Sequence, residues 1–161
     1  MNVQFSLVLL LTLFSCRSET VCVCPTCPDG WSLMDNYCYR FYPQEEEWQM
    51  ADAICNQVDE TKSSSLVSIH SVKENKFVGK LAGKARSWIG LNDRFTEGKF
   101  EYTDGSPFTY DAFPPPEPNN AGRGENCVEI NNSGTLGRWN DHRCSVRKPF
   151  ICQMWPTYKE K

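Results

Sequence analysis

The sequence predicts one α+β domain that is rich in loops and cross-linked by disulfides. Its 161 residues fit a single domain of ordinary size. Two segments with helical spacing of apolar residues lie among several short strand-like runs, a pattern typical of mixed α and β structure. Nine cysteines and ten prolines in so short a chain indicate loops that are held in place by covalent links.

The first 18 residues are expected to be a secretion signal. The apolar run from Phe5 to Phe14 is shorter than the roughly 20 helical residues that a membrane span needs. Cleavage after Ser18 would place small residues, Cys16 and Ser18, at the −3 and −1 positions of the cleavage site. An alternative, a lipoprotein acylation box ending at Cys16, is disfavoured by Phe14 and by the lack of basic residues before the run. We therefore expect a secreted, extracellular protein without membrane insertion.

Charge and cysteine spacing exclude several classes of partner. The net charge is −3 and no basic cluster stands out along the chain, so no nucleic acid or anionic membrane is expected as a partner. The run "CVCPTC" resembles half of a zinc site, but the only two histidines, His70 and His142, lack the spacing to complete one. Signal removal leaves an even number of cysteines, which predicts disulfides in an oxidising compartment. These are Cys22, Cys24, Cys27, Cys38, Cys55, Cys127, Cys144 and Cys152.

Helical and strand-like segments alternate along the chain. The segment "EEEWQMADAICNQ" places Trp48 and Cys55 at helical spacing behind an acidic first turn, which suits the positive end of a helix dipole. A second helix is expected from Ser71 and Glu74, a capping box in which hydroxyl and carboxylate satisfy each other's free backbone donors. Strands are expected over 37–42, 87–91, 99–102, 126–130 and 149–154.

A long loop rich in proline and glycine lies between the expected strands 99–102 and 126–130. It ends in "EPNNAGRGE", from Glu117 to Glu125. Loops longer than about 15 residues in a compact domain are usually functional or disordered. The segment is therefore either an ordinary solvated loop or a cage of oxygen atoms for a hard cation.

Several motifs together resemble the C-type lectin-like domain from Cys27 to Gln153. They are "CPDGW" followed by "CYRFY", a Trp-bearing helix that ends in Cys55, "WIGLND", "EPN", "ENCVEI", "WND" and "FIC". The resemblance implies an α+β fold with two helices flanking small antiparallel sheets and a long calcium-binding loop. It is most similar to secreted single-domain lectins of invertebrates. The implied organisation is a leader over 19–26, the long-form lectin domain over 27–155 and a tail over 156–161, with disulfides Cys27–Cys38, Cys55–Cys152 and Cys127–Cys144.

The oxygen-bearing residues of the loop fit a principal calcium site. Calcium takes six to eight oxygen ligands and prefers carboxylates and amide carbonyls. A cis bond at Glu117-Pro118 would turn the two flanking side-chain oxygens toward one ion. With one backbone carbonyl, which the resemblance places at Asp141, two positions remain for the vicinal hydroxyls of a sugar. The candidate ligands of both calcium and sugar are Glu117, Asn119, Glu125, Asn140 and Asp141.

A second calcium site of the family would use Asp93, Glu97, Asn120 and Asn126. Two amides stand where the resemblance gives carboxylates, and the loss of two negative charges weakens calcium binding. The alternative is that Asp93 and Glu97 belong to a solvated turn.

The Glu-Pro-Asn order is similar to that of mannose, fucose and glucose binders. Galactose binding favours an aromatic wall beside the sugar ring, and Ala121 offers none. Phe113 or Trp139 would be the substitute, although Trp139 is expected in the core. We expect the mannose class, with a galactose-specific lectin as the alternative, and the resemblance implies agglutination of microbes.

Catalysis is not expected from this set of residues. A glycosidase pair of Glu117 and Glu125, or a hydrolytic site at His142 beside Asp141, needs separated acid and base roles. Carboxylates around one cation stay ionised, which is the wrong state for a general acid. The remaining alternative is a module of the same fold that binds proteins, for which calcium would be dispensable.

Two further expectations concern the cysteines left over and a sequon. Cys22 and Cys24 lack partners in the implied pairing and are candidates for interchain disulfides that link a homo-oligomer, with a dimer favoured. A local bridge between them, or capping by small thiols, is the alternative. Asn131 in "NNS" fits a glycosylation sequon.

Overall fold

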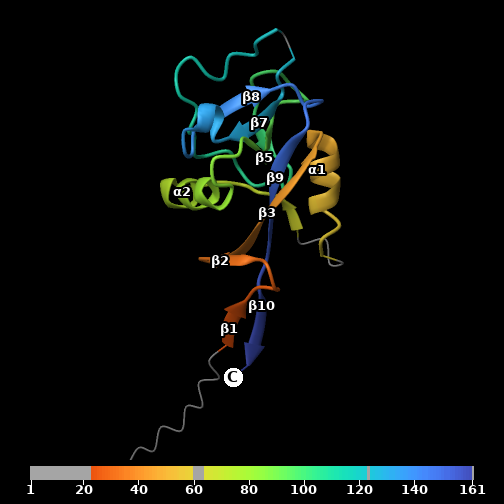
Figure 1. Cartoon of the computed structure of the whole chain (residues 1–161), viewed down its shortest axis with the longest axis vertical. Coiled ribbons are helices and arrows are strands. Elements are labelled where there is room, and N and C mark those ends of the chain that lie inside the picture. The colour runs from red at the N-terminus through yellow and green to blue at the C-terminus, as the bar shows by residue number, and fades with distance from the viewer. Residues whose placement is uncertain (1–22, 60–63, 123, 161) are drawn as a thin grey trace, which may run out of the picture.

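The computed structural model describes residues 23–59, 64–122 and 124–160. Two helices flank an eight-stranded sheet whose main path runs β2-β3-β9-β5-β7-β8, with β4 paired to β9 and β6 to β5 (Figure 1). The elements of this sheet are β2 Ser32–Met34, β3 Tyr37–Glu46, β4 Ser64–Leu66, β5 Ser87–Asn92, β6 Glu101–Tyr102, β7 Cys127–Ile130, β8 Trp139–His142 and β9 Lys148–Met154. The helices are α1 Trp48–Cys55 and α2 Val72–Leu81, with a short 3-10 turn, Asn132–Gly134. The α+β fold with two helices is therefore confirmed.

A separate two-stranded ribbon joins the two ends of the described chain. Strand β1 Val23–Thr26 pairs antiparallel with β10 Thr157–Glu160. The ribbon extends away from the body of the domain, at the end opposite the long loop (Figure 1). Neither described helix is long and apolar enough to cross a membrane.

The acidic first turn expected for the first helix is wrong. Strand β3 continues through Glu46, Glu47 is the N-cap without a side-chain hydrogen bond, and α1 begins at Trp48 with no acid in its first turn. The reason is tertiary, since Glu46 pairs with Lys148 of β9 in the sheet. The buried face of the helix, with Trp48 and Cys55, is as expected.

The second helix has half of the expected capping box. The Ser71 hydroxyl accepts a hydrogen bond from Glu74 N at 3.1 Å. The Glu74 carboxylate, however, accepts from His70 N at 2.7 Å and from the Tyr39 hydroxyl at 2.8 Å. Glu74 is only 8% exposed, and its two oxygens are used by the core Tyr39 and by the N–H one residue before the N-cap, so neither bonds to the N-cap N–H.

Three disulfides connect the layers of the fold, in the pairing that the resemblance implied. Cys55–Cys152 ties α1 to β9, Cys127–Cys144 closes the segment that follows the long loop, and Cys27–Cys38 links the base of the ribbon to β3. Trp48, Trp88 and Trp139 are at most 1% exposed and form the largest side chains of the core.

Candidate functional site

The long loop lies on an aromatic cluster around Trp139. The rings of Tyr110 and Phe113 each meet the Trp139 ring edge-on at 5.6 Å, and Phe108 lies 6.4 Å from it. Trp139 N donates to Ala112 O at 3.2 Å, which adds the loop backbone to the edge of β8. Trp139 thus places the end of the loop beside the two residues that follow it in β8. As expected, Trp139 belongs to the core.

The tip of the loop is bound to Asp141 through backbone groups. The Asp141 carboxylate accepts from Asn119 N at 3.1 Å and from Asn120 N at 2.6 Å. The Glu125 carboxylate accepts from Ala121 N at 3.0 Å. The Glu117-Pro118 bond is cis. These contacts bring three carboxylates, from Glu117, Glu125 and Asp141, to one end of the domain.

Glu117 is the least satisfied group of this cluster. Its Oε2 atom is buried and accepts no hydrogen bond from the described residues. Burial raises the pKa of the Glu117 carboxyl, and the neighbouring Asp141 carboxyl raises this pKa further. A buried acceptor without a donor costs about 1–3 kcal/mol, more when it is charged. A cation among these oxygens would remove that cost, so the residues present fit calcium.

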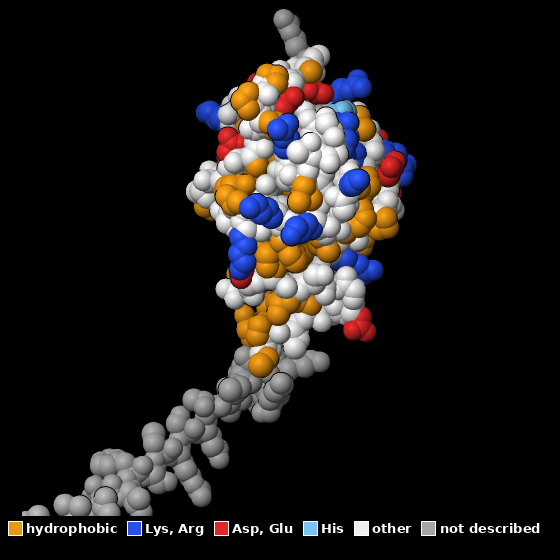
Figure 2. All heavy atoms as spheres, turned by 60° about the vertical axis from the view of Figure 1, so that its left-hand side comes forward, with side chains coloured by type: hydrophobic (Ala, Val, Ile, Leu, Met, Phe, Trp, Pro, Cys, Tyr) orange, Lys and Arg blue, Asp and Glu red, His pale blue; other side chains and the backbone are white. Residues whose placement is uncertain are grey.

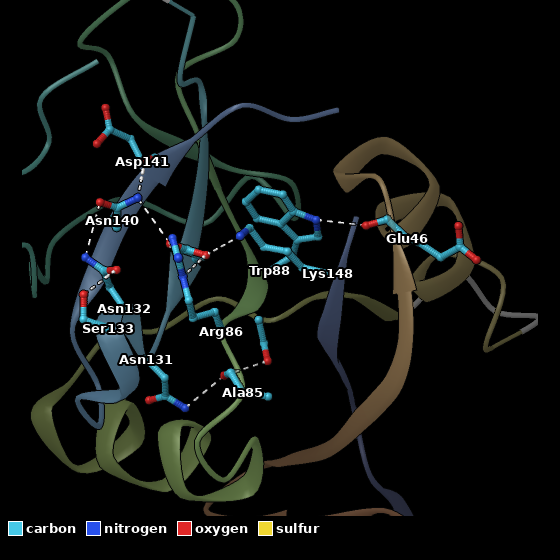
Figure 3. A network of polar contacts seen from close by, with 12 residues as sticks. Glu46, Ala85, Arg86, Trp88, Asn131, Asn132, Ser133, Asn140, Asp141 and Lys148 are labelled. Carbon is cyan, nitrogen blue, oxygen red and sulfur yellow. Dashed lines mark hydrogen bonds and ion pairs between the residues drawn. The ribbon is translucent and has the colours of Figure 1, made fainter. Parts of the chain in front are cut away.

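Asn140 joins the cluster to a buried ion-pair network (Figure 3). Its Nδ2 donates to Glu129 Oε1 at 3.2 Å and also to the Asp141 carbonyl, the oxygen that the resemblance adds to the ligand set. Glu129 is fully buried and pairs with Lys148 Nζ at 2.8 Å and with the Arg86 guanidinium. The network therefore holds the Asn140 amide in position from behind the site.

Sequence reasoning missed Glu129, Arg86 and Lys148. The one available signal was an acid inside an otherwise apolar strand, "CVEI", which needs a buried cation as partner. The identity of the cation that pairs with Glu129 depends on the strand order, in which β7 and β9 lie on either side of β5.

The four residues of the second expected site are only partly brought together. Asn126 Nδ2 donates to Asp93 Oδ1 at 3.2 Å and to Glu97 Oε2 at 3.3 Å, so an amide hydrogen-bonds to both carboxylates. Asn120 is turned elsewhere, because its Oδ1 accepts from Gly124 N and Glu125 N at 2.6 and 2.9 Å. Because an amide N–H group, and not an oxygen, faces both carboxylates, this arrangement does not favour a second cation.

No cluster of three or more His, Cys, Asp and Glu side chains suited to a metal appears within 23–59, 64–122 and 124–160. A calcium site at the loop therefore depends on the amide and carbonyl oxygens beside the carboxylates. The His142 ring meets the Trp88 ring at 6.3 Å, and burial lowers the pKa of His142.

Burial of Asn131 argues against glycosylation at this sequon. Asn131 is 0% exposed. Its Nδ2 donates to Gly79 O at 2.9 Å and to Gly83 O at 3.1 Å, and its Oδ1 accepts from Gly137 N. The nitrogen that a glycan would modify instead holds α2 and the following turn against the segment before β8.

Of the two cysteines without partners, Cys22 lies outside the described residues. Cys24 is in β1, is half-buried and forms no disulfide within the described part of the chain.

Comparison with known proteins identifies the fold family. Residues 44–154 match the lectin C-type domain. The chain belongs to the C-type lectin family. This family is non-enzymatic, in agreement with the expectation from the carboxylate cluster.

Relatives of this C-type lectin include a receptor and other lectins. It is 39% identical over 135 residues to the low affinity immunoglobulin epsilon Fc receptor of Mus musculus, covering 83% of this chain but 39% of the receptor. It is 34% identical over 132 residues to the galactose-specific lectin nattectin of Thalassophryne nattereri, covering 79% of each chain. The crystal structure of the cow CD23 carbohydrate-recognition domain with a GlcNAc2Man3 oligosaccharide is 38% identical, with a TM-score of 0.74 over 83% of this chain and 99% of that one.

Proposed function

We propose that this C-type lectin is a secreted, calcium-dependent receptor for carbohydrates, with the sugar bound at the tip of the long loop. The observation that carries the proposal is the buried, unpartnered Oε2 of Glu117 beside the carboxylates of Asp141 and Glu125. The adjacent carboxyl groups of Glu117 and Asp141, with Glu125 nearby, favour a doubly charged cation over an apolar or anionic ligand.

The calcium ligands would be Glu117, Asn119, Glu125, Asn140 and Asp141. The bound ion supplies coordination positions for two sugar hydroxyls. Around it, the carboxylates would accept the hydroxyl protons and the Asn119 amide would donate to a hydroxyl oxygen. Asn140, whose Nδ2 donates to Glu129 and to the Asp141 carbonyl, would offer its oxygen to the ion. Glu129 supports this arrangement because it accepts from Asn140 Nδ2, while Asn140 Oδ1 accepts from Asn132 Nδ2 at 3.4 Å and keeps a second lone pair for the ion.

We further propose the mannose, fucose and glucose class of sugar. The Phe113 ring already packs against Trp139 at 5.6 Å and Phe100 at 5.4 Å, and Ala121 has no ring. The Phe113 ring is therefore engaged with other rings, and Ala121 offers no aromatic face on which galactose could stack. The relative nattectin, which is named galactose-specific, makes galactose the alternative outcome.

The test is retention of the mature protein on mannose and galactose resins, in calcium and then in EDTA. Retention on mannose with release by EDTA is the expected result. Glu117→Gln should abolish retention, while Lys99→Gln, an exposed charge change outside the candidate site, should not. Retention on galactose alone would overturn the sugar class, and indifference to both sugars and to EDTA would overturn the function.

Linkage of two copies through Cys22 and Cys24 would raise avidity, because each domain offers one shallow site. Non-reducing electrophoresis of the secreted protein should show a dimer that Cys22→Ser/Cys24→Ser converts to monomer. A monomer in the unmodified protein would contradict this part of the proposal.

A further inference from the structure

A basic surface forms on the side of the domain that carries α2, although no basic cluster stands out in the sequence. Residues 75–92 and 142–159 contain no Asp or Glu. The fold brings parts of these two segments together: a hollow of about 380 Å³ is lined by Lys84 and Arg86 from the first and by Arg147 and Lys148 from the second. Figure 2, which turns the α2 side forward, shows Lys and Arg side chains in a band across the middle of this face.

The band consists of the exposed cations Lys76, Lys80, Lys84, Arg86 and Arg147. Lys76 and Lys80 lie one helical turn apart, about 6 Å along the axis of α2. Among the described residues, neither forms an ion pair. Lys84 follows the helix in a turn whose carbonyls are held by Asn131 Nδ2, so the helix and the hollow are rigidly connected.

Among the described residues, the acids that pair with a member of the band or line the hollow lie at its far end, and Glu74 and Asp35 near the start of α2 bind Tyr39 and Lys73 instead. Glu129 is fully buried and is already paired with Arg86 and Lys148. Glu46 pairs with Arg147 at 3.2 Å, and Glu45 lines the hollow. In the part of the chain that the structure describes, no acid forms an ion pair with Lys76, Lys80 or Lys84, in a protein whose net charge is −3. Such separation of charge attracts anions to one face only.

We propose that this band binds an acidic linear polysaccharide of the sulfated glycosaminoglycan class, independently of calcium. A polysaccharide with a sulfate or carboxylate on successive sugar units presents anions at intervals that match cations spaced along a helix. The exposed aromatic side chains that the structure describes, Phe95, Trp155 and Tyr158, belong to other segments, so the band lacks the stacking groups that favour single-stranded nucleic acid. Two exposed aliphatic side chains do lie near the band, Val72 at the start of α2 and Leu136 beside Gly79, so binding to a membrane is tested directly below.

None of the candidate calcium ligands belongs to the band. Binding of the polyanion should therefore survive EDTA, whereas binding of a neutral sugar at the loop should not. This difference separates failure of the present proposal from failure of the lectin function.

The test uses the mature protein, heparin as the probe and a series of salt concentrations in EDTA. The variant K76Q/K80Q removes two exposed charges from the band, and R94Q/K99Q removes two exposed charges from another segment as the matched control. We expect K76Q/K80Q to weaken heparin binding about tenfold and to lower the slope of log affinity against log salt by about 1–2, by analogy with counterion release from nucleic acids. The control should change affinity less than about twofold.

Three results would overturn the proposal. The first is heparin retention no greater than retention on neutral dextran at low salt. The second is an equal loss in both variants, which would mean that only net charge matters. The third is binding to vesicles containing phosphatidylserine that exceeds binding to heparin, which would assign the band to a membrane.

Discussion

The buried pair between Lys148 and Glu129 provides the sharpest test of how the site is supported. The substitution Lys148→Met removes the ammonium but keeps an unbranched side chain against Trp88, whose ring centre lies 5.1 Å from Nζ. Glu129 is fully buried and Lys148 is 7% exposed, so water cannot replace the lost charge. The variant therefore isolates the electrostatic contribution of one buried cation.

The expected loss of stability follows from the geometry. At the observed 2.8 Å, two unit charges in an effective dielectric of about 20 attract by about 6 kcal/mol. Removal of Lys148 also removes its own desolvation cost, and Arg86 continues to pair with Glu129. We expect a net loss of about 2–4 kcal/mol in the free energy of unfolding.

The measurement is urea unfolding of the disulfide-intact protein at neutral pH. The matched control is Lys73→Met, which breaks a pair with Asp35 of similar length, 2.6 Å, but with side chains 68% and 59% exposed. An exposed pair of this kind contributes at most about 1 kcal/mol. If Lys148→Met lowered stability no more than Lys73→Met, the network could not be what holds Glu129 and Asn140 in place.

Four other predictions are independent of that network. Glu117→Gln should weaken calcium binding at least about tenfold by calorimetry, and an unchanged affinity would remove Glu117 from the ligand set. Phe113→Ala should cost about 3 kcal/mol and weaken calcium binding as well, because the ring anchors the loop on Trp139; urea unfolding with and without calcium separates the two effects. Burial raises the pKa of Asp52, so its charge opposes folding once the pH rises above that pKa, and Asp52→Asn should raise the melting temperature at pH 7 but not at pH 3. Intact mass of the secreted protein should show no glycan on Asn131, and a glycan at this site would contradict its burial.

The elements that depend on local spacing could be predicted from the sequence. Trp48 and Cys55 recur at helical intervals, and their burial follows from that periodicity alone. Ser71 is an N-cap because its hydroxyl reaches a donor only three residues away. The composition of "EPNNAGRGE" likewise indicated an oxygen-rich loop before any fold was known, because proline and glycine exclude regular structure there.

Only the tertiary structure decided the contacts between residues far apart in the chain. Glu74 binds Tyr39 and His70 N instead of completing a capping box, the Asn131 amide donates to a carbonyl of α2, and Glu129 meets Lys148 across the sheet. The basic band is of the same kind, since Lys84 and Arg147 are neighbours only after folding. Local patterns specify which face of an element is buried. Which polar groups then meet depends on strand order and register, which arise from the packing of the whole chain.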